Sequence, residues 1–206
     1  MNGETIVRLA SGEHALFGYG SLLSIASMER TLGRGYNGQW HVCRLHGWRR
    51  GWDVFMPRHS WLYRDAEGQV MRPERVIYLN LRERAGATCN GALFVVTDED
   101  LKRFDEREWI YERRRINDTL AGVRVEGGDA WTYAGLDAYL VRENWRPPQA
   151  IIRRSYLEII ERAHKELGEE FRREYYASTD QFDEALAFDD FREWDSAPTP
   201  PAKLAL

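Results

Sequence analysis

The chain has 206 residues, a formal net charge of −4 and a charged share of 30%. Its 43% hydrophobic share is typical of a soluble globular protein with one substantial core. The acidic balance argues against a phosphate-backbone binder, which needs a basic surface, so we expect no nucleic-acid partner. No apolar run approaches the roughly 20 residues that span a bilayer, and two cysteines are too few for a disulfide framework. We therefore expect a cytoplasmic protein with free thiols and no membrane partner.

The first predicted elements surround a turn that contains two glycines. Residues 15–17 form a short apolar run, which is typical of a buried strand, and the chain then turns. Ser24 is suited to cap a helix that carries Met28 and Leu32 inward and ends at Gly33. Glycines at such a junction let the backbone adopt positive φ and approach a ligand closely. We therefore expect the N–H groups of this turn to receive a carboxylate or an oxyanion.

The middle of the chain is predicted to be mainly β-structure. We expect strands at residues 38–55, 75–81, 91–96, 115–125 and 130–141, and a hairpin turn at 126–129 between the last two. Residues 57–72 are expected to form an irregular loop. Thr97, followed three residues later by Asp100, predicts a capping box and a helix.

The last third contains a predicted amphipathic helix over residues 149–167 and an acidic segment. A proline-rich tail follows at 196–206, after a single domain spanning 1–195. Hairpins and meanders combined with helices favour an α+β fold, either a mixed sheet or a small closed barrel flanked by helices.

Two patterns around the turn are typical of other enzyme classes but are incomplete. Gly18-x-Gly20 begins like a dinucleotide fingerprint, but Leu23 occupies the position of the third glycine. Ser21 follows a strand as a hydrolase nucleophile does, but Tyr19 and Leu23 stand where that motif has glycines. We interpret Ser21 as a hydrogen-bonding residue rather than a nucleophile.

The sequence His41-x-Cys43-x-x-His46 contains three residue types that bind metal ions. On a strand, however, residues 41 and 43 share a face while His46 points the other way, so the three side chains would not converge. We expect no metal site and no cofactor.

Glu108 is the candidate for proton chemistry. It follows Leu101 and Phe104 at spacings of three and seven, which places it on the inward face of the helix, whereas Glu106 should point to water. A buried carboxylate at a helix C-terminus is disfavoured in its charged form, so its pKa should be raised, as a general base working near neutrality requires. The alternative is a buried glutamate paired with an arginine of residues 113–115, and spacing leaves both interpretations open.

Three blocks of the sequence resemble the γ-glutamylcyclotransferase-like superfamily. The stretch Phe17-Gly18-Tyr19-Gly20-Ser21-Leu22-Leu23 is similar to its Tyr-Gly-Ser loop. Residues 91–96, Leu101, Phe104-Asp105-x-x-Glu108 and Tyr111-x-Arg113 resemble the block that carries its catalytic glutamate. Residues 139–141, Pro147-Pro148 and 156–163 resemble its C-terminal region, and the blocks run in family order from about residue 15 to residue 176.

This resemblance implies a cofactor-free enzyme of the same kind. The reaction would convert a γ-glutamyl amino acid, amine or peptide to 5-oxoproline and release the amine by intramolecular acyl transfer. Glu108 would be the catalytic base and acid. The loop residues Tyr19, Gly20, Ser21 and Leu22 would bind the substrate's α-carboxylate.

The sequence leaves more than one role open for Tyr156 and for Trp109. Tyr156 matches a substrate-contact tyrosine of the family, but a core position on an amphipathic helix is the alternative. Trp109 stands where many members have glycine, and is expected to narrow the pocket or to select the acyl-acceptor side. It also supports a second hypothesis, a non-catalytic ligand-binding or regulatory protein on the same fold. The sequence decides neither the γ-glutamyl substrate nor the oligomeric state.

Overall fold

The computed structural model describes residues 4–57 and 59–192. The strands are β1 (Thr5–Arg8), β2 (Glu13–Gly18), β3 (Trp40–Met56), β4 (Trp61–Arg64), β5 (Val70–Met71), β6 (Arg75–Thr97), β7 (Tyr111–Arg115), β8 (Leu120–Ala121), β9 (Val123–Glu126), β10 (Ala130–Gly135), β11 (Ala150–Arg153), β12 (Ala187–Phe188) and β13 (Asp190–Arg192). The α-helices are α1 (Ile25–Leu32), α2 (Asp98–Arg107), α3 (Arg154–Leu167) and α4 (Glu169–Ala177). The predicted tail at 196–206 lies outside the described residues, so the domain boundary at 195 stays a prediction.

The central sheet is mixed and curls into a half-barrel. Its strand order is β12-β11-β6-β2-β10-β7, with β3 paired to both β6 and β8. β2 has one parallel neighbour, β10, and one antiparallel neighbour, β6. β6 has one parallel neighbour, β11, and two antiparallel neighbours, β2 and β3. The predicted α+β architecture of a mixed sheet flanked by helices is confirmed. In the described part of the chain the end strands β12 and β7 do not pair with each other, so the sheet is curled but open.

Two long antiparallel strands, β3 and β6, form the frame of this sheet. Their pairing runs from Trp40 opposite Phe94 to Met56 opposite Val76. The stretches 75–81 and 91–96, predicted as separate strands, are therefore parts of one strand of 23 residues. The apolar pattern is interrupted between these stretches, and at that point the pairing of β6 with β3 shifts register and Gly86 adopts φ +75°.

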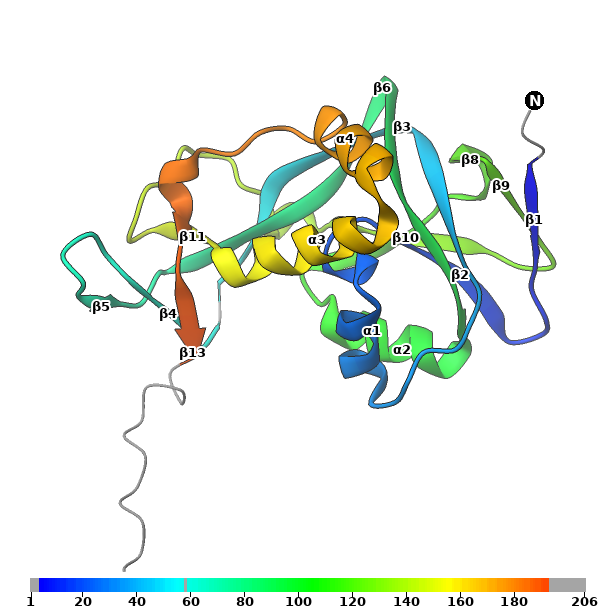
Figure 1. Ribbon diagram of the computed structural model, residues 1–206, viewed down its shortest axis with the longest axis horizontal. Coiled ribbons are helices and arrows are strands. Elements are labelled where there is room, and N and C mark those ends of the chain that lie inside the picture. The colour runs from blue at the N-terminus through cyan, green and yellow to red at the C-terminus, as the bar shows by residue number, and fades with distance from the viewer. Residues whose placement is uncertain (1–3, 58, 193–206) are drawn as a thin grey trace, which may run out of the picture.

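Helices α1 and α2 pack beside the sheet, and α3 crosses in front of β6 (Figure 1). Leu16, Phe17 and Phe94 from the strands meet Met28 of α1 and Phe104 of α2 in one fully buried cluster. Each of these side chains stabilises the fold by about 1.5–3 kcal/mol through burial. This packing holds the C-terminal end of α2 near the turn that follows β2.

The predicted helix caps are present. The Ser24 side chain accepts a hydrogen bond from the Ser27 amide at 3.3 Å, and α1 ends at Gly33 with φ +68°. The Thr97 hydroxyl accepts from the Asp100 amide at 3.2 Å, while the Asp100 carboxylate accepts from the Thr97 amide at 3.4 Å. Caps of this kind contribute about 1 kcal/mol each and fix where the helices begin.

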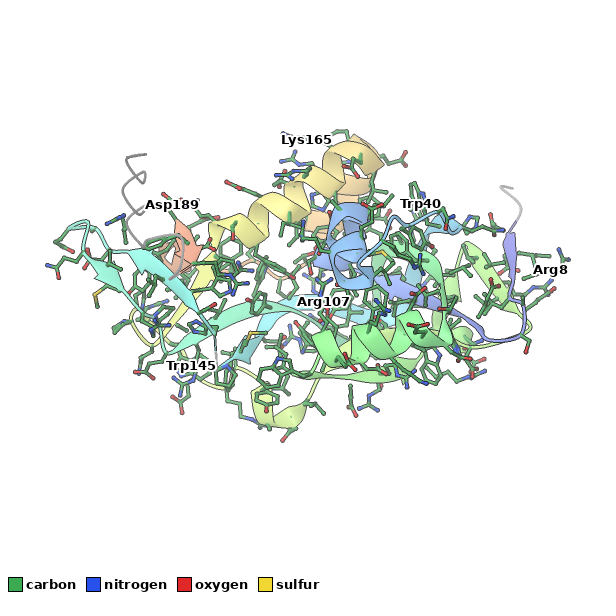
Figure 2. The ribbon with its side chains drawn as sticks, turned by 90° about the horizontal axis from the view of Figure 1, so that it is seen from below. Arg8, Trp40, Arg107, Trp145, Lys165 and Asp189 are labelled. Atoms are coloured by element: carbon green, nitrogen blue, oxygen red, sulfur yellow. The ribbon has the colours of Figure 1, made fainter. Side chains whose placement is uncertain are left out.

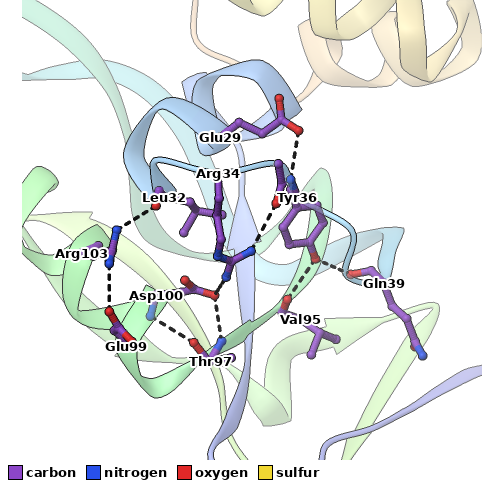
Figure 3. A network of polar contacts seen from close by, with 11 residues as sticks. Glu29, Leu32, Arg34, Tyr36, Gln39, Val95, Thr97, Glu99, Asp100 and Arg103 are labelled. Carbon is purple, nitrogen blue, oxygen red and sulfur yellow. Dashed lines mark hydrogen bonds and ion pairs between the residues drawn. The ribbon is translucent and has the colours of Figure 1, made fainter.

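A polar network ties the start of α2 to the end of α1 (Figure 3). Asp100 also pairs with Arg34, which follows α1. Arg103 donates to the Leu32 carbonyl at 2.7 Å and pairs with Glu99 at 2.8 Å. These contacts set the direction of α2, and thereby the position of the residues at its C-terminus.

Several predicted elements differ from those observed. The strand expected over 115–125 is divided, because a 3₁₀ turn over Asn117–Thr119 separates β7 from β8 and β9, and the strand expected over 130–141 ends at Gly135. Strands β9 and β10 do not form a hairpin, because β9 pairs in parallel with β1 while β10 pairs with β2 and β7. The helix expected from residue 149 begins at Arg154, since residues 150–151 pair with β6 as strand β11. Residues 57–72 are not wholly irregular: they contain β4 and β5, which form a three-stranded sheet with β13. None of the helices described here has both the length and the apolar character needed to cross a membrane.

Candidate active site

A cavity of about 940 Å³ opens between the turn after β2, helices α1 to α3 and the β4 segment. All six predicted site residues line it: Tyr19, Gly20, Ser21, Leu22, Glu108 and Tyr156. The turn and Glu108 are some ninety positions apart in the sequence, and the fold places both at the wall of this one cavity. Their roles in binding and catalysis stay proposals, developed below.

The turn after β2 is a single turn of 3₁₀ helix over Ser21–Leu23. The sequence predicted that glycines occupy this turn because the backbone adopts positive φ. That prediction is wrong, because neither Gly18 nor Gly20 has positive φ, and Gly20 has φ −122°. Close packing is the reason instead. A Cβ on Gly18 would lie 2.7 Å from the Leu22 carbonyl oxygen, and one on Gly20 would lie 2.7 Å from the Tyr156 hydroxyl.

Glu108 directly follows α2 and its side chain faces the cavity, where it is 15% exposed. Burial raises its pKa above the ordinary value, and the charge of Arg107 lowers it in part. The Arg107 Nε lies 2.9 Å from the Glu108 carboxylate. The alternative, an ion pair of Glu108 with an arginine of residues 113–115, is not observed, because these arginines pair with Asp105, Glu112 and Asp129. Glu106 is exposed, as predicted.

Arg107 is a site residue that the sequence reasoning missed. Besides contacting Glu108, its guanidinium donates to the Ser21 hydroxyl at 2.8 Å and to the Thr31 hydroxyl at 2.7 Å. It also donates to the Ser27 carbonyl at 3.1 Å. One side chain near the centre of the molecule thus fixes the turn, α1 and the carboxylate relative to one another (Figure 2). Its partners lie 76 to 86 residues upstream, so no local pattern marks it.

Four tyrosines surround the Glu108 carboxylate closely enough for its charge to act on them: Tyr19, Tyr111, Tyr133 and Tyr156. Burial is the main cause that raises the pKa of each of these hydroxyls well above 10, and the charge of Glu108 adds to it. All four therefore remain protonated near neutral pH and act as hydrogen-bond donors.

Three of these hydroxyls are committed to the protein itself. Tyr19 donates to the Tyr133 carbonyl at 2.9 Å, Tyr111 to the Leu79 carbonyl at 2.8 Å, and Tyr133 to the Asp105 carboxylate at 2.8 Å. The Tyr156 oxygen accepts a hydrogen bond from the Ser21 amide. Within the described ranges no acceptor takes the Tyr156 proton, so it is available to a molecule in the cavity.

Trp109 does not take the place expected for it. It is absent from the cavity wall, is 41% exposed and packs edge-on against Tyr139 at 5.4 Å between ring centroids. It therefore does not narrow the cavity.

The His41-x-Cys43-x-x-His46 segment lies in β3, outside the cavity wall. Cys43 is buried as a free thiol, and His46 Nδ1 lies 2.9 Å from the Thr88 hydroxyl. Across residues 4–57 and 59–192, no three His, Cys, Asp or Glu side chains are grouped to hold a metal ion.

No protein-family model matches the chain, and no curated protein does. Solved structures do match. A γ-glutamyl cyclotransferase aligns over 82% of this chain and 90% of its own, with 16% identity and a TM-score of 0.53. The chain has the γ-glutamyl cyclotransferase fold.

Two further structures share this fold. An uncharacterized human protein aligns over 84% of this chain and 92% of its own, with 16% identity and a TM-score of 0.54. A yeast γ-glutamyl cyclotransferase specific to glutathione aligns over 81% and 93%, with 11% identity and a TM-score of 0.50. At such identities the likeness gives the architecture, and the chemistry is argued from the geometry of the site.

Proposed function

We propose that this protein is a γ-glutamylcyclotransferase-type enzyme. It converts a γ-glutamyl amino acid, amine or peptide to 5-oxoproline and releases the amine. The observation that carries the proposal is the position of Glu108: a largely buried carboxylate with a raised pKa, in the same cavity as the turn at residues 19–22. The fold of the protein supports the same proposal, because solved structures named γ-glutamyl cyclotransferase share this fold.

Binding is assigned to the turn and to Tyr156. The first amides of a helical turn have no acceptor within the turn, so those of Gly20 and Leu22, on either side of the Ser21 amide that donates to Tyr156, can receive the substrate's α-carboxylate. The Tyr156 hydroxyl, held beside Gly20 with its proton uncommitted, donates to a substrate oxygen. These contacts fold the glutamyl chain so that its amine approaches its own γ-carbonyl carbon.

Glu108 moves one proton twice in this reaction. It takes a proton from the α-ammonium, and the freed amine attacks the γ-carbonyl carbon, forming the ring C–N bond and an oxyanion. Glu108 then returns the proton to the leaving nitrogen, the old C–N bond breaks, and the oxyanion collapses to the carbonyl of 5-oxoproline. The second proton lost by the ring nitrogen ends on the released amine, so no water, oxidant or cofactor is consumed.

The raised pKa of Glu108 suits both of its tasks. A carboxylate that ionises closer to neutrality is a stronger base in the first step and still releases its proton in the second. Donors in the turn and at Tyr156 stabilise the oxyanion, a contribution commonly worth about 3–4 kcal/mol for one well-placed donor.

The test is 5-oxoproline release from a panel of γ-glutamyl amino acids, γ-glutamyl amines and glutathione. We expect at least one compound to give 5-oxoproline and its amine in equal amounts. Binding without release from any compound would favour the alternative, a ligand-binding or regulatory protein. The sequence support for that alternative was Trp109, which lies outside the cavity wall.

A further inference from the structure

One end of the cavity, away from the turn, is built by residues 59–61 at the start of β4, by the end of β11 and by β13. We call this the arginine end, and it comprises His59, Ser60, Trp61, Arg153 and Arg192. The Arg153 guanidinium lies 3.8 Å from the centre of the Trp61 ring, and that of Arg192 lies 3.6 Å from it. Arg192 also donates to the Ser60 hydroxyl. Two cations are thus held by one indole at the cavity wall.

Positive charge dominates the described lining of the cavity. Its described lining includes two carboxylates, Glu108 and Glu158, and five guanidinium groups: Arg30, Arg107, Arg153, Arg162 and Arg192. An acid beside the arginine end, Asp190, has a fully buried side chain and is already engaged. It pairs with Arg153 at 3.3 Å and accepts hydrogen bonds from the amide and hydroxyl of Ser155 at 2.9 and 2.6 Å.

One buried nitrogen at the arginine end, Arg153 Nε, has no hydrogen-bond partner within the described chain. Arg153 is only 7% exposed, so water does not readily satisfy its Nε group. A buried donor without a partner costs about 1–3 kcal/mol, and more when it is charged. A bound anion would supply the missing acceptor for this charged donor, on a cavity wall that is rich in guanidinium groups.

A continuous wall connects this end to the candidate catalytic group. Tyr156, beside Gly20, meets Tyr78 with 5.0 Å between ring centroids, and Arg153 lies 5.5 Å from the Tyr78 ring. A substrate with its glutamyl part at Glu108 would therefore extend its leaving group past Tyr78. The cavity, at about 940 Å³, is large enough for such an extended ligand.

We propose that the arginine end binds a negatively charged group on the leaving part of the substrate, several bonds from the scissile amide. This inference rests on the proposed function and narrows its substrate class to γ-glutamyl amides whose released amine carries a distal anion, with a carboxylate as the simplest case. Neutral and cationic γ-glutamyl amines are then poor substrates.

Pairs of γ-glutamyl compounds of equal length test the proposal. In the first pair the leaving group is 4-aminobutyrate in one compound and butylamine in the other. In the second pair the leaving groups are 6-aminohexanoate and hexylamine. We expect kcat/KM to favour the carboxylate on the order of 10- to 100-fold, mainly through KM, as charge-assisted hydrogen bonds would give. Equal kcat/KM within each pair, with 5-oxoproline still formed, would overturn the subsite and leave the proposed function standing.

Variants locate the preference within the cavity. His59→Asn and Arg192→Gln should each reduce the carboxylate preference at least severalfold, mainly by raising KM for the carboxylate compounds. Arg162→Gln, in the same cavity but on α3, and Arg154→Gln, outside the cavity wall, are the matched controls and should retain it. A preference lost in Arg162→Gln but kept in the other cavity variants would place the anion elsewhere and overturn the proposal.

A binding measurement separates the two proposals if no compound is turned over. Burial, with Arg72, Arg153 and Arg192 nearby, lowers the pKa of His59 to about 4. An anion bound at the arginine end should raise the pKa of this ring, which NMR titration can follow with His59→Asn as the assignment control. A rise with the carboxylate compounds, and none with the alkylamine compounds, supports the subsite even without catalysis. No rise with either set would overturn it.

Discussion

The contact between Gly20 and Tyr156 gives a specific prediction, because a single atom, the Tyr156 hydroxyl oxygen, leaves no room for a side chain at position 20. A Cβ at position 20 would lie 2.7 Å from the Tyr156 hydroxyl oxygen, 0.7 Å inside the 3.4 Å at which ordinary contact begins. The next atoms in its way belong to Leu79, at 3.8 and 3.9 Å. Gly20→Ala should therefore displace Tyr156 and cost about 1–3 kcal/mol of unfolding free energy, as overpacking does.

Removing the hydroxyl should relieve this clash. Tyr156→Phe alone loses the hydrogen bond with the Ser21 amide, at about 1 kcal/mol. In the double variant Gly20→Ala/Tyr156→Phe the methyl group has room, so the two costs should not add, and the coupling energy should be about 1–2 kcal/mol. Urea unfolding of all four proteins measures it. Gly35→Ala is the control, since its Cβ would approach nothing closer than 3.8 Å.

Simple additivity in this cycle would refute the contact. Activity gives a second readout, because both single variants disturb the same proposed binding group. The Gly20→Ala enzyme should lose kcat/KM at least tenfold in 5-oxoproline release, and the Gly35→Ala enzyme should lose none. A Gly20→Ala protein with wild-type stability and activity would mean that the turn and α3 are not in this contact.

Three other predictions concern charge and exposure. Arg107→Met should cost about 2–4 kcal/mol, because its guanidinium joins three segments. It should also move the acid limb of the kcat/KM profile to higher pH, because Arg107 lowers the pKa of Glu108. Trp109→Ala should leave kcat/KM within about twofold in the same assay, since the side chain lies outside the cavity wall. Burial lowers the pKa of His164 to about 4, so protonation favours unfolding. Stability should therefore fall between about pH 6.5 and 4 by up to about 3 kcal/mol, and His164→Phe should abolish this fall in urea titrations.

Local signals predicted the parts of the fold that short-range contacts determine. Ser24 and Thr97 cap their helices as expected because a cap is a hydrogen bond between residues two or three positions apart. Strand β2 and the inward face of α2 could also be predicted, because the spacing of apolar residues alone indicates them. The position of Glu108 at the cavity follows from that same spacing.

The remaining features depend on partners far along the chain. Residues 150–151 are a strand because Arg75 and Val76 of β6 pair with them, although their sequence also suits a helix. The β4 segment forms a sheet because β13, more than a hundred residues later, adds to it. Arg107 becomes part of the site through α1 and the turn, and no neighbouring residue indicates those contacts. Sequence-local reasoning cannot supply such information.

The account depends on Glu108 as the group that moves the proton. The most direct measurement compares kcat for 5-oxoproline release in Glu108→Gln and in Glu106→Gln, an exposed carboxylate two positions away. We expect Glu108→Gln to lose on the order of 10²–10⁴-fold in kcat, with substrate Kd and Tm close to wild type, and Glu106→Gln to lose nothing. A Glu108→Gln enzyme that keeps wild-type kcat on a substrate turned over by the native protein would contradict the mechanism.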